Sequence, residues 1–182
     1  MEARAALAVD QRDYFAHFAL GRLYVVKGDH QAAAQEIRDA LQINPNFAHG
    51  YLGLASVYYW LGDGPTVLEN ANMAIRLSPN DPLMWLFLLY KAHGHELNGE
   101  FDRAIECFEQ ASRFPRVFYW AFTKLAAAYY EVGRKEEAAE ALVQARRIEP
   151  QLSLESQRKA LRFIRHNKFD YYLRNMEALG LE

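Results

Sequence analysis

The sequence predicts an all-α protein, a right-handed superhelical solenoid in which helical hairpins stack one after another. Three observations lead to this fold class. Apolar, small and aromatic residues recur with a period of about 34 residues, a glycine recurs near the middle of each period, and a proline recurs near its end. The composition, 51% hydrophobic and 24% charged among 182 residues, is that of a globular protein rather than a disordered one.

The first helix of each unit is predicted from a recurring leucine, small residue and tyrosine. Leu20, Gly21 and Tyr24 lie at spacings that put them on one face of a helix, and the small residue lets the paired helix approach closely. Later residues of the same kinds fall in these columns: Leu54, Ala55 and Tyr58, then Leu125, Ala126 and Tyr129.

Glycine and proline predict where the helices end. A turn glycine recurs at Gly28, Gly62, Gly99 and Gly133, where a left-handed backbone can end the first helix. An alanine column marks the second helix, at Ala40, Ala74, Ala111 and Ala145, and Pro45, Pro79 and Pro150 follow it. We therefore expect four units, 14–47, 48–81, 82–118 and 119–152, with helices at 14–27 and 31–44 in the first.

Three parts of the chain depart from this pattern. Gly99 follows Gly62 by three residues more than the period, so the first helix of the third unit is expected to be about one turn longer. Residues 1–13 read as the tail of a truncated preceding repeat, which makes the chain the C-terminal piece of a longer protein. Residues 153–182 are expected to form a capping helix at 153–166 and a short terminal helix between Asp170 and Gly180.

The columns resemble the consensus of the tetratricopeptide repeat (TPR) family, in which an aromatic residue precedes the leucine, small residue and tyrosine. His17, Tyr51, Trp85 and Phe122 occupy that aromatic column, with His17 a departure from it. Ala16 to Arg22, Leu77 to Leu83 and the closing Leu-Arg-Asn-Met-Glu-Ala-Leu-Gly-Leu-Glu are similar to the C-terminal TPR region of bacterial class III adenylate/guanylate cyclases or TPR transcriptional regulators. The resemblance implies a protein–protein interaction module from a bacterial signalling protein.

The residues predict no catalytic, cofactor or metal site. His93 and His95 invite a metal interpretation, but side chains two positions apart on a helix point in nearly opposite directions. Cys107, the single cysteine, has no histidine or aspartate at catalytic spacing and is expected to be a small buried residue. The sequence contains no phosphate-binding glycine loop, nucleophile elbow or zinc hairpin.

Charge and hydropathy bear on partners and location. The net charge of −2 favours neither nucleic acid nor an acidic membrane surface as a partner, and no apolar run of about 18 residues could span a bilayer. The single cysteine is typical of a reducing compartment, so a cytoplasmic location is expected. The basic stretch 158–168 is interpreted as the solvated face of the capping helix, with an anionic partner as the alternative.

The first helices of the hairpins line a concave channel in this fold, so one face of these helices is the expected ligand surface. That face is aromatic and apolar. Phe18 stands where TPR proteins that capture carboxylates carry a lysine, which argues against carboxylate capture. The predicted peptide-groove residues are Phe15, Phe18, Arg22, His49, Leu52, Ser56, Tyr59, Leu86, Tyr90, His93, Trp120, Thr123 and Tyr130. Among them Tyr59, Tyr90, Trp120 and Tyr130 are expected to contribute most to binding.

Two functions follow from these residues. The favoured one is non-enzymatic binding of a protein or peptide, through an apolar or amphipathic segment that lies in the groove. The alternative is a scaffold for homodimerisation, or for intramolecular regulation of a cyclase or DNA-binding domain outside this chain.

Overall fold

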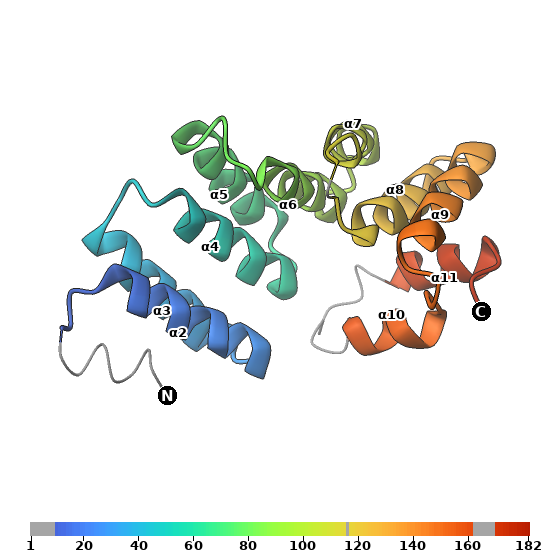
Figure 1. The fold of residues 1–182 in the computed structure, drawn as a ribbon. Helices are drawn as coiled ribbons and strands as arrows, with labels where there is room; N and C mark the ends of the chain where they lie inside the picture. Colours follow the sequence, from blue (N-terminus) through green and yellow to red (C-terminus); the bar gives the residue numbers. More distant parts are fainter. Residues whose placement is uncertain (1–9, 116, 162–169) are drawn as a thin grey trace.

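The computed structural model describes residues 10–115, 117–161 and 170–182, and these ranges contain helices and no strand. Figure 1 shows the helices stacked in an arc, from the blue first hairpin to the orange and red C-terminal helices. The helices are α2 (Tyr14–Lys27), α3 (His30–Ile43), α4 (Ala48–Leu61), α5 (Gly64–Leu77), α6 (Met84–Leu97), α7 (Phe101–Ser112), α8 (Tyr119–Glu131), α9 (Lys135–Ile148), α10 (Leu154–Ala160) and α11 (Asp170–Ala178). The predicted all-α solenoid of hairpins is confirmed.

Local chemistry sets the helix ends. The Asp13 carboxylate accepts hydrogen bonds from two N–H groups in the first turn of α2, and Asp29 and Asp63 each accept one backbone N–H in the first turn of α3 and α5. Gly28 has a φ of 76°, so the predicted left-handed end of α2 is confirmed. The turn glycines of the other three units also have positive φ values, between 76° and 83°.

Small residues let the two helices of a hairpin touch. A Cβ atom on Gly21 would lie 2.6 Å from Cγ1 of Ile37 and 3.1 Å from the carbonyl oxygen of Ala33, so α2 can approach α3 only because position 21 has no side chain. The alanine column does the same from the second helix, since Ala40 and Ala145 are both fully buried. The repeat columns are therefore the helix–helix contacts.

The third unit corrects one prediction. α6 has 14 residues, as α2 and α4 do, so the expected extra turn is absent. Most of the additional length lies in the connection before α6, because residues 78–83 separate α5 from α6 whereas residues 44–47 separate α3 from α4. Pro79 and Pro82 explain this, since a residue that precedes proline is disfavoured in helical geometry, and α6 begins only at Met84.

The C-terminal residues cover the last hairpin. α11 packs against α8, and Figure 1 shows α10 and α11 together beneath the end of the arc. Tyr172, Met176 and Leu181 are buried there, and the Asn175 amide donates hydrogen bonds to the Ala127 carbonyl and to Glu131. A fourth hairpin without this cover would expose the apolar face of α8.

Two predictions fall wholly or partly outside the described residues. The expected repeat tail at 1–13 falls there for residues 1–9, and the expected capping helix and basic stretch fall there for residues 162–169. None of the helices in the described ranges has the length and apolar character needed to cross a membrane.

Candidate functional site

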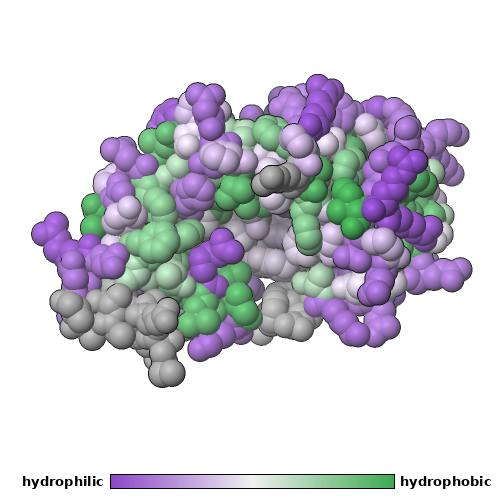
Figure 2. All heavy atoms as spheres, viewed as in Figure 1, coloured by the Kyte–Doolittle hydropathy of each residue, from purple (hydrophilic) through white to green (hydrophobic). Residues whose placement is uncertain are grey.

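Three successive hairpins form a pocket of about 310 Å³ on the groove side of their first helices. Figure 2 shows the molecular surface hollowed near its middle, with pale and green residues around the hollow and purple residues mostly at the periphery. The lining is aromatic and aliphatic, with one arginine and no carboxylate. It consists of Arg22, Val25 and Val26 from α2; Leu52, Gly53, Ser56, Tyr59 and Trp60 from α4; Trp85, Leu86, Leu89, Tyr90 and His93 from α6; and Phe118 and Trp120 at the start of α8.

Few polar groups reach this pocket. The Tyr90 hydroxyl donates a hydrogen bond to Ser56 Oγ over 3.0 Å, which joins α6 to α4 across the pocket wall. Burial raises the pKa of Tyr90, while the Ser56 hydrogen bond and the positive charge of Arg22 act in the opposite direction. Arg22 has no hydrogen-bond or ion-pair partner among the described residues. The indole Nε1 of Trp120 is buried and has no acceptor in the same ranges.

The floor of the pocket is a packed ring pair. The rings of Tyr59 and His93 stack with their centroids 4.2 Å apart, and each residue is 1% exposed. Tyr90 meets Tyr59 edge-on at 6.0 Å and His93 at 5.9 Å. These contacts fix the floor before any ligand arrives, which lowers the entropy cost of binding.

Behind the floor lies a buried group of charged side chains. His93 Nδ1 donates to Glu96 Oε2 over 2.8 Å, and Lys124 Nζ lies 3.6 Å from Glu96 Oε1. The Tyr171 hydroxyl of α11 also donates to Glu96. His93, Glu96 and Lys124 are 1%, 4% and 3% exposed, so α6, α8 and α11 meet at one buried carboxylate.

The protonation states of this group follow from burial and pairing. Burial alone would raise the pKa of Glu96, but Lys124, His93 and Tyr171 outweigh it and bring that pKa to about 2. Burial lowers the pKa of Lys124 to about 8, although the nearby Glu96 carboxylate acts to raise it. Burial also lowers the pKa of His93. At neutral pH the interior therefore holds a Glu96–Lys124 ion pair and a neutral His93.

The structure brings most of the predicted groove residues together in the pocket. They are Arg22, Leu52, Ser56, Tyr59, Leu86, Tyr90, His93 and Trp120. Leu52, Tyr59 and His93 are buried in its wall and floor, so a ligand could meet only their pocket-facing edges.

The other predicted groove residues are not part of the pocket lining. Phe15 is 60% exposed near the start of α2, and Phe18 packs edge-on against Phe47 at 5.0 Å. His49 packs edge-on against Phe87 at 5.6 Å. Thr123 is fully buried and donates to the Trp120 carbonyl, and Tyr130 lies beneath the Lys135 ammonium at 5.7 Å.

The list of predicted residues lacks several that line the pocket, among them Val26, Trp60, Trp85 and Phe118. Val26 and Trp60 occupy equivalent positions of the first and second units, so the repeat itself could have identified them. Trp85 falls in the aromatic column that the repeat assigns to packing, and Phe118 precedes its helix; neither has a periodic signal for the groove.

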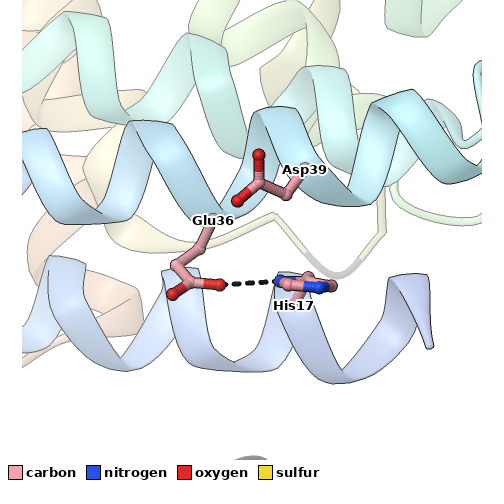
Figure 3. A group of neighbouring side chains, drawn as sticks. All are labelled: His17, Glu36 and Asp39. Carbon is pink, nitrogen blue, oxygen red and sulfur yellow. Dashed lines mark hydrogen bonds and ion pairs between the residues drawn. The ribbon is translucent and has the colours of Figure 1, made fainter. Parts of the chain in front are cut away.

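A separate cluster at the first hairpin has the residue types of a metal site. One ligand atom each from His17, Glu36 and Asp39 lies within 4.8 Å of the others. Figure 3 shows His17 on α2 directed at Glu36 on α3, with Asp39 above them. His17 Nδ1 donates to Glu36 over 2.8 Å, and Nε2 lies 3.2 Å from the Gln11 carbonyl. Both ring nitrogens are already used, so the cluster is an ion pair with a neighbouring aspartate.

The histidines of the third hairpin do not converge on one ion. His93 contacts Glu96, whereas His95 contacts Glu100 over 2.5 Å on the far side of the helix. Gly94 between them has a packing role, because a Cβ atom there would lie 2.6 Å from Cγ of Leu68 on α5. Cys107 is buried, as predicted.

Comparison of this chain with known protein families and solved structures agrees with this fold. Residues 14–47 match the family model described as a tetratricopeptide repeat. A thermophilic TPR protein from Thermus thermophilus has a similar structure, with a TM-score of 0.73 and 21% identity over 98% of this chain and 88% of that one. The type IV pilus biogenesis factor PilW is similar with a TM-score of 0.74 and 19% identity, over 97% of this chain and 82% of PilW. YrrB, a TPR protein with an unusual peptide-binding site, is similar with a TM-score of 0.63 and 23% identity, over 82% of this chain and 75% of YrrB.

At these identities the likeness establishes the fold, which is the TPR solenoid. No catalytic family is indicated. A search among curated proteins gave no match.

Proposed function

We propose that this chain is a non-enzymatic protein-binding module whose groove holds an apolar or amphipathic segment of a partner protein. The observation that carries the proposal is the pocket between α2, α4 and α6, where aromatic side chains from several hairpins converge on one space of about 310 Å³. A volume of this size accommodates one or two large side chains of a peptide.

The physical chemistry of the lining supports this ligand class. Tyr90 and Trp120 are only partly buried, and rigid rings offer large contact areas at a small cost in side-chain entropy. Arg22 is the one charged side chain among the lining residues if His93 is neutral. Affinity should therefore change only a few-fold between low and high salt.

Selection of random peptides against the full chain tests the proposal. Tyr90→Ala and Trp120→Ala should each weaken the selected peptides by about 2 kcal/mol while circular dichroism shows unchanged helicity. Tyr130→Ala serves as the comparison, because Tyr130 lies outside the pocket on α8. A loss at Tyr130 as large as that at Tyr90 would extend the site along α8. Peptides that bind equally well to the Tyr90 and Trp120 variants would remove the pocket as the site.

The cellular context is part of the proposal and rests on the sequence resemblance. We place the module in the C-terminal part of a bacterial signalling protein, in the cytoplasm, with a cyclase or a DNA-binding domain elsewhere in the same protein. The alternative function is a scaffold for homodimerisation or for intramolecular regulation of that domain. Sedimentation of the chain distinguishes the two, since a dimer that dissociates on Tyr90→Ala would mean that a second copy occupies the groove.

A further inference from the structure

We propose that the partner segment carries a carboxylate side chain next to a large apolar side chain, and that Arg22 binds this carboxylate at the edge of the pocket. The inference rests on the proposed function and specifies the chemistry of the ligand. Its starting point is the polarity of the lining, in which the available polar groups are donors.

Arg22 is the first of these donors. Its side chain lines the pocket, is exposed to solvent, and has no carboxylate or other acceptor among the described residues. It lines the same pocket as the hydroxyl groups of Ser56 and Tyr90. A guanidinium matches the geometry of a carboxylate and binds it through two parallel hydrogen bonds.

Ser56 is the second donor. Its Oγ accepts the hydrogen bond from Tyr90 over 3.0 Å, and it has no other hydrogen-bond partner in the described ranges. The hydroxyl hydrogen of Ser56 is thus available to an acceptor in the pocket. Trp120 adds an indole N–H without an acceptor, which becomes accessible if the ring turns about its side-chain bonds.

The lining also excludes the opposite ligand charge. Six aromatic side chains surround the pocket, an arrangement that can hold an organic cation. Here, however, the lining contains no aspartate or glutamate, and Arg22 would repel a cation. The Glu96 carboxylate behind the floor is already paired with Lys124 and accepts from His93 and Tyr171. An acidic group therefore fits the pocket better than a basic one.

The position of the pocket favours a side chain over a chain end as the source of the carboxylate. Its lining comes from three consecutive hairpins and from the start of a fourth, so that a segment can pass across all of them. In such an arrangement the apolar side chain enters between Trp85, Leu86 and Trp120, and a neighbouring aspartate or glutamate reaches Arg22.

The experiment selects random peptides, displayed as internal segments, against the full chain and against its Arg22→Gln variant. Peptides selected by the unmodified chain should combine aspartate or glutamate with a large apolar residue. Changing the acidic residue to its amide, in a synthetic peptide with blocked ends, should weaken binding about fivefold. The same change should have less than about a twofold effect on Arg22→Gln, because the two substitutions remove one interaction. Arg103→Gln is the control, since Arg103 is an exposed arginine on α7 outside the pocket.

The outcomes separate the two levels of the proposal. Peptides that require Tyr90 and Trp120 but tolerate both Arg22→Gln and loss of their acidic residue would overturn the carboxylate inference and leave the groove function intact. A requirement for a free C-terminal carboxylate in the synthetic peptides would overturn the side-chain assignment. Selected peptides that are indifferent to Tyr90 and Trp120 would overturn the groove function, and the inference with it.

Discussion

The first hairpin and the junction of α6, α8 and α11 contain the same contact in different surroundings. His17 Nδ1 lies 2.8 Å from Glu36 Oε2 in the first, and His93 Nδ1 lies 2.8 Å from Glu96 Oε2 in the second. The pKa of His17 is nevertheless raised from its ordinary value, whereas that of His93 is lowered. Equal geometry thus produces opposite protonation behaviour.

Burial and neighbouring charge account for the difference. The side chains of His17 and Glu36 remain 18% and 22% exposed, and there the hydrogen bonds to Glu36 and Gln11 outweigh the lowering of the pKa by burial. The side chains of His93 and Glu96 are 2% and 1% exposed, so burial dominates, and Lys124 supplies the positive charge that balances Glu96. Lys124 keeps its charge at neutral pH, so the lysine at 3.6 Å, rather than the nearer His93, supplies the counter-charge of Glu96.

The largest effect is expected from Lys124→Met, which leaves Glu96 buried without its cation. The free energy of unfolding at neutral pH should fall by about 3–5 kcal/mol. Urea unfolding followed by circular dichroism measures this. The double variant Glu96→Gln/Lys124→Met should recover most of the loss, because no unpaired charge then remains. A single variant as stable as the unmodified chain would mean that the two groups do not form a compensated pair.

Acid should destabilise the junction more than the first hairpin, by up to about 3 kcal/mol. The folded-state pKa of Glu96 is depressed, so its contribution is present above the unfolded value of 4.5 and is lost as pH falls toward about 2. The pKa of His93 is also lowered, so further stability is lost as pH falls below 6.5. Urea unfolding across this range checks the prediction, and Glu96→Gln should remove the loss below pH 4.5.

The alanine column should respond alike in the first and the fourth hairpin. Ala40→Leu in α3 and Ala145→Leu in α9 place a large side chain at fully buried helix contacts, and each should cost about 1–3 kcal/mol by overpacking. Thermal unfolding of the two variants provides the measurement. Melting midpoints that stay unchanged would show that these alanines are not the points of closest approach. A much larger cost at one site would show that the repeat interior differs between the regions.

The smallest effect is expected from Glu36→Gln, which removes the partly exposed ion pair of His17. Stability should change by at most about 1 kcal/mol. The pKa of His17 is raised, so its contribution is present below pH 6.5 and is lost as pH rises through the folded value. NMR titration of the two imidazoles should give a value above 6.5 for His17 and one below 6.5 for His93. Glu36→Gln should lower only the former.

The sequence predicted those features that arise within one repeat unit. Gly28 and its counterparts end first helices because glycine adopts positive φ without steric cost, and Asp13 and Asp29 cap helices through their own backbone neighbours. The sequence shows that the third unit is longer, but the prediction that its first helix contains the extra residues was wrong. The spacing between Gly62 and Gly99 does not say whether residues are added to a helix or to the connection before it, and Pro79 and Pro82 decided for the connection.

The groove was predictable only as a stripe along each first helix. The stripe contains Arg22, Ser56 and Tyr90, which the structure brings to one pocket, but it also contains Phe15 and Thr123, which lie outside it. Thr123 is fully buried because α8 contacts both α7 and α11. No periodicity in the sequence predicts that α11 packs against α8. The periodic stripe predicts which face of a helix points to the groove. Whether a residue on that face is exposed depends on the other helices that pack over it.

What the sequence alone determined is the repeated hairpin, because its signals act between residues a few positions apart: glycine and proline at helix ends, and small residues at helix contacts. What only the tertiary structure decided is which side chains from different units contact one another. Tyr171 and Glu96 are 75 positions apart and share a hydrogen bond, and Lys124 joins them from α8. Such neighbours depend on the rotation between hairpins accumulated along the solenoid, which no single unit encodes.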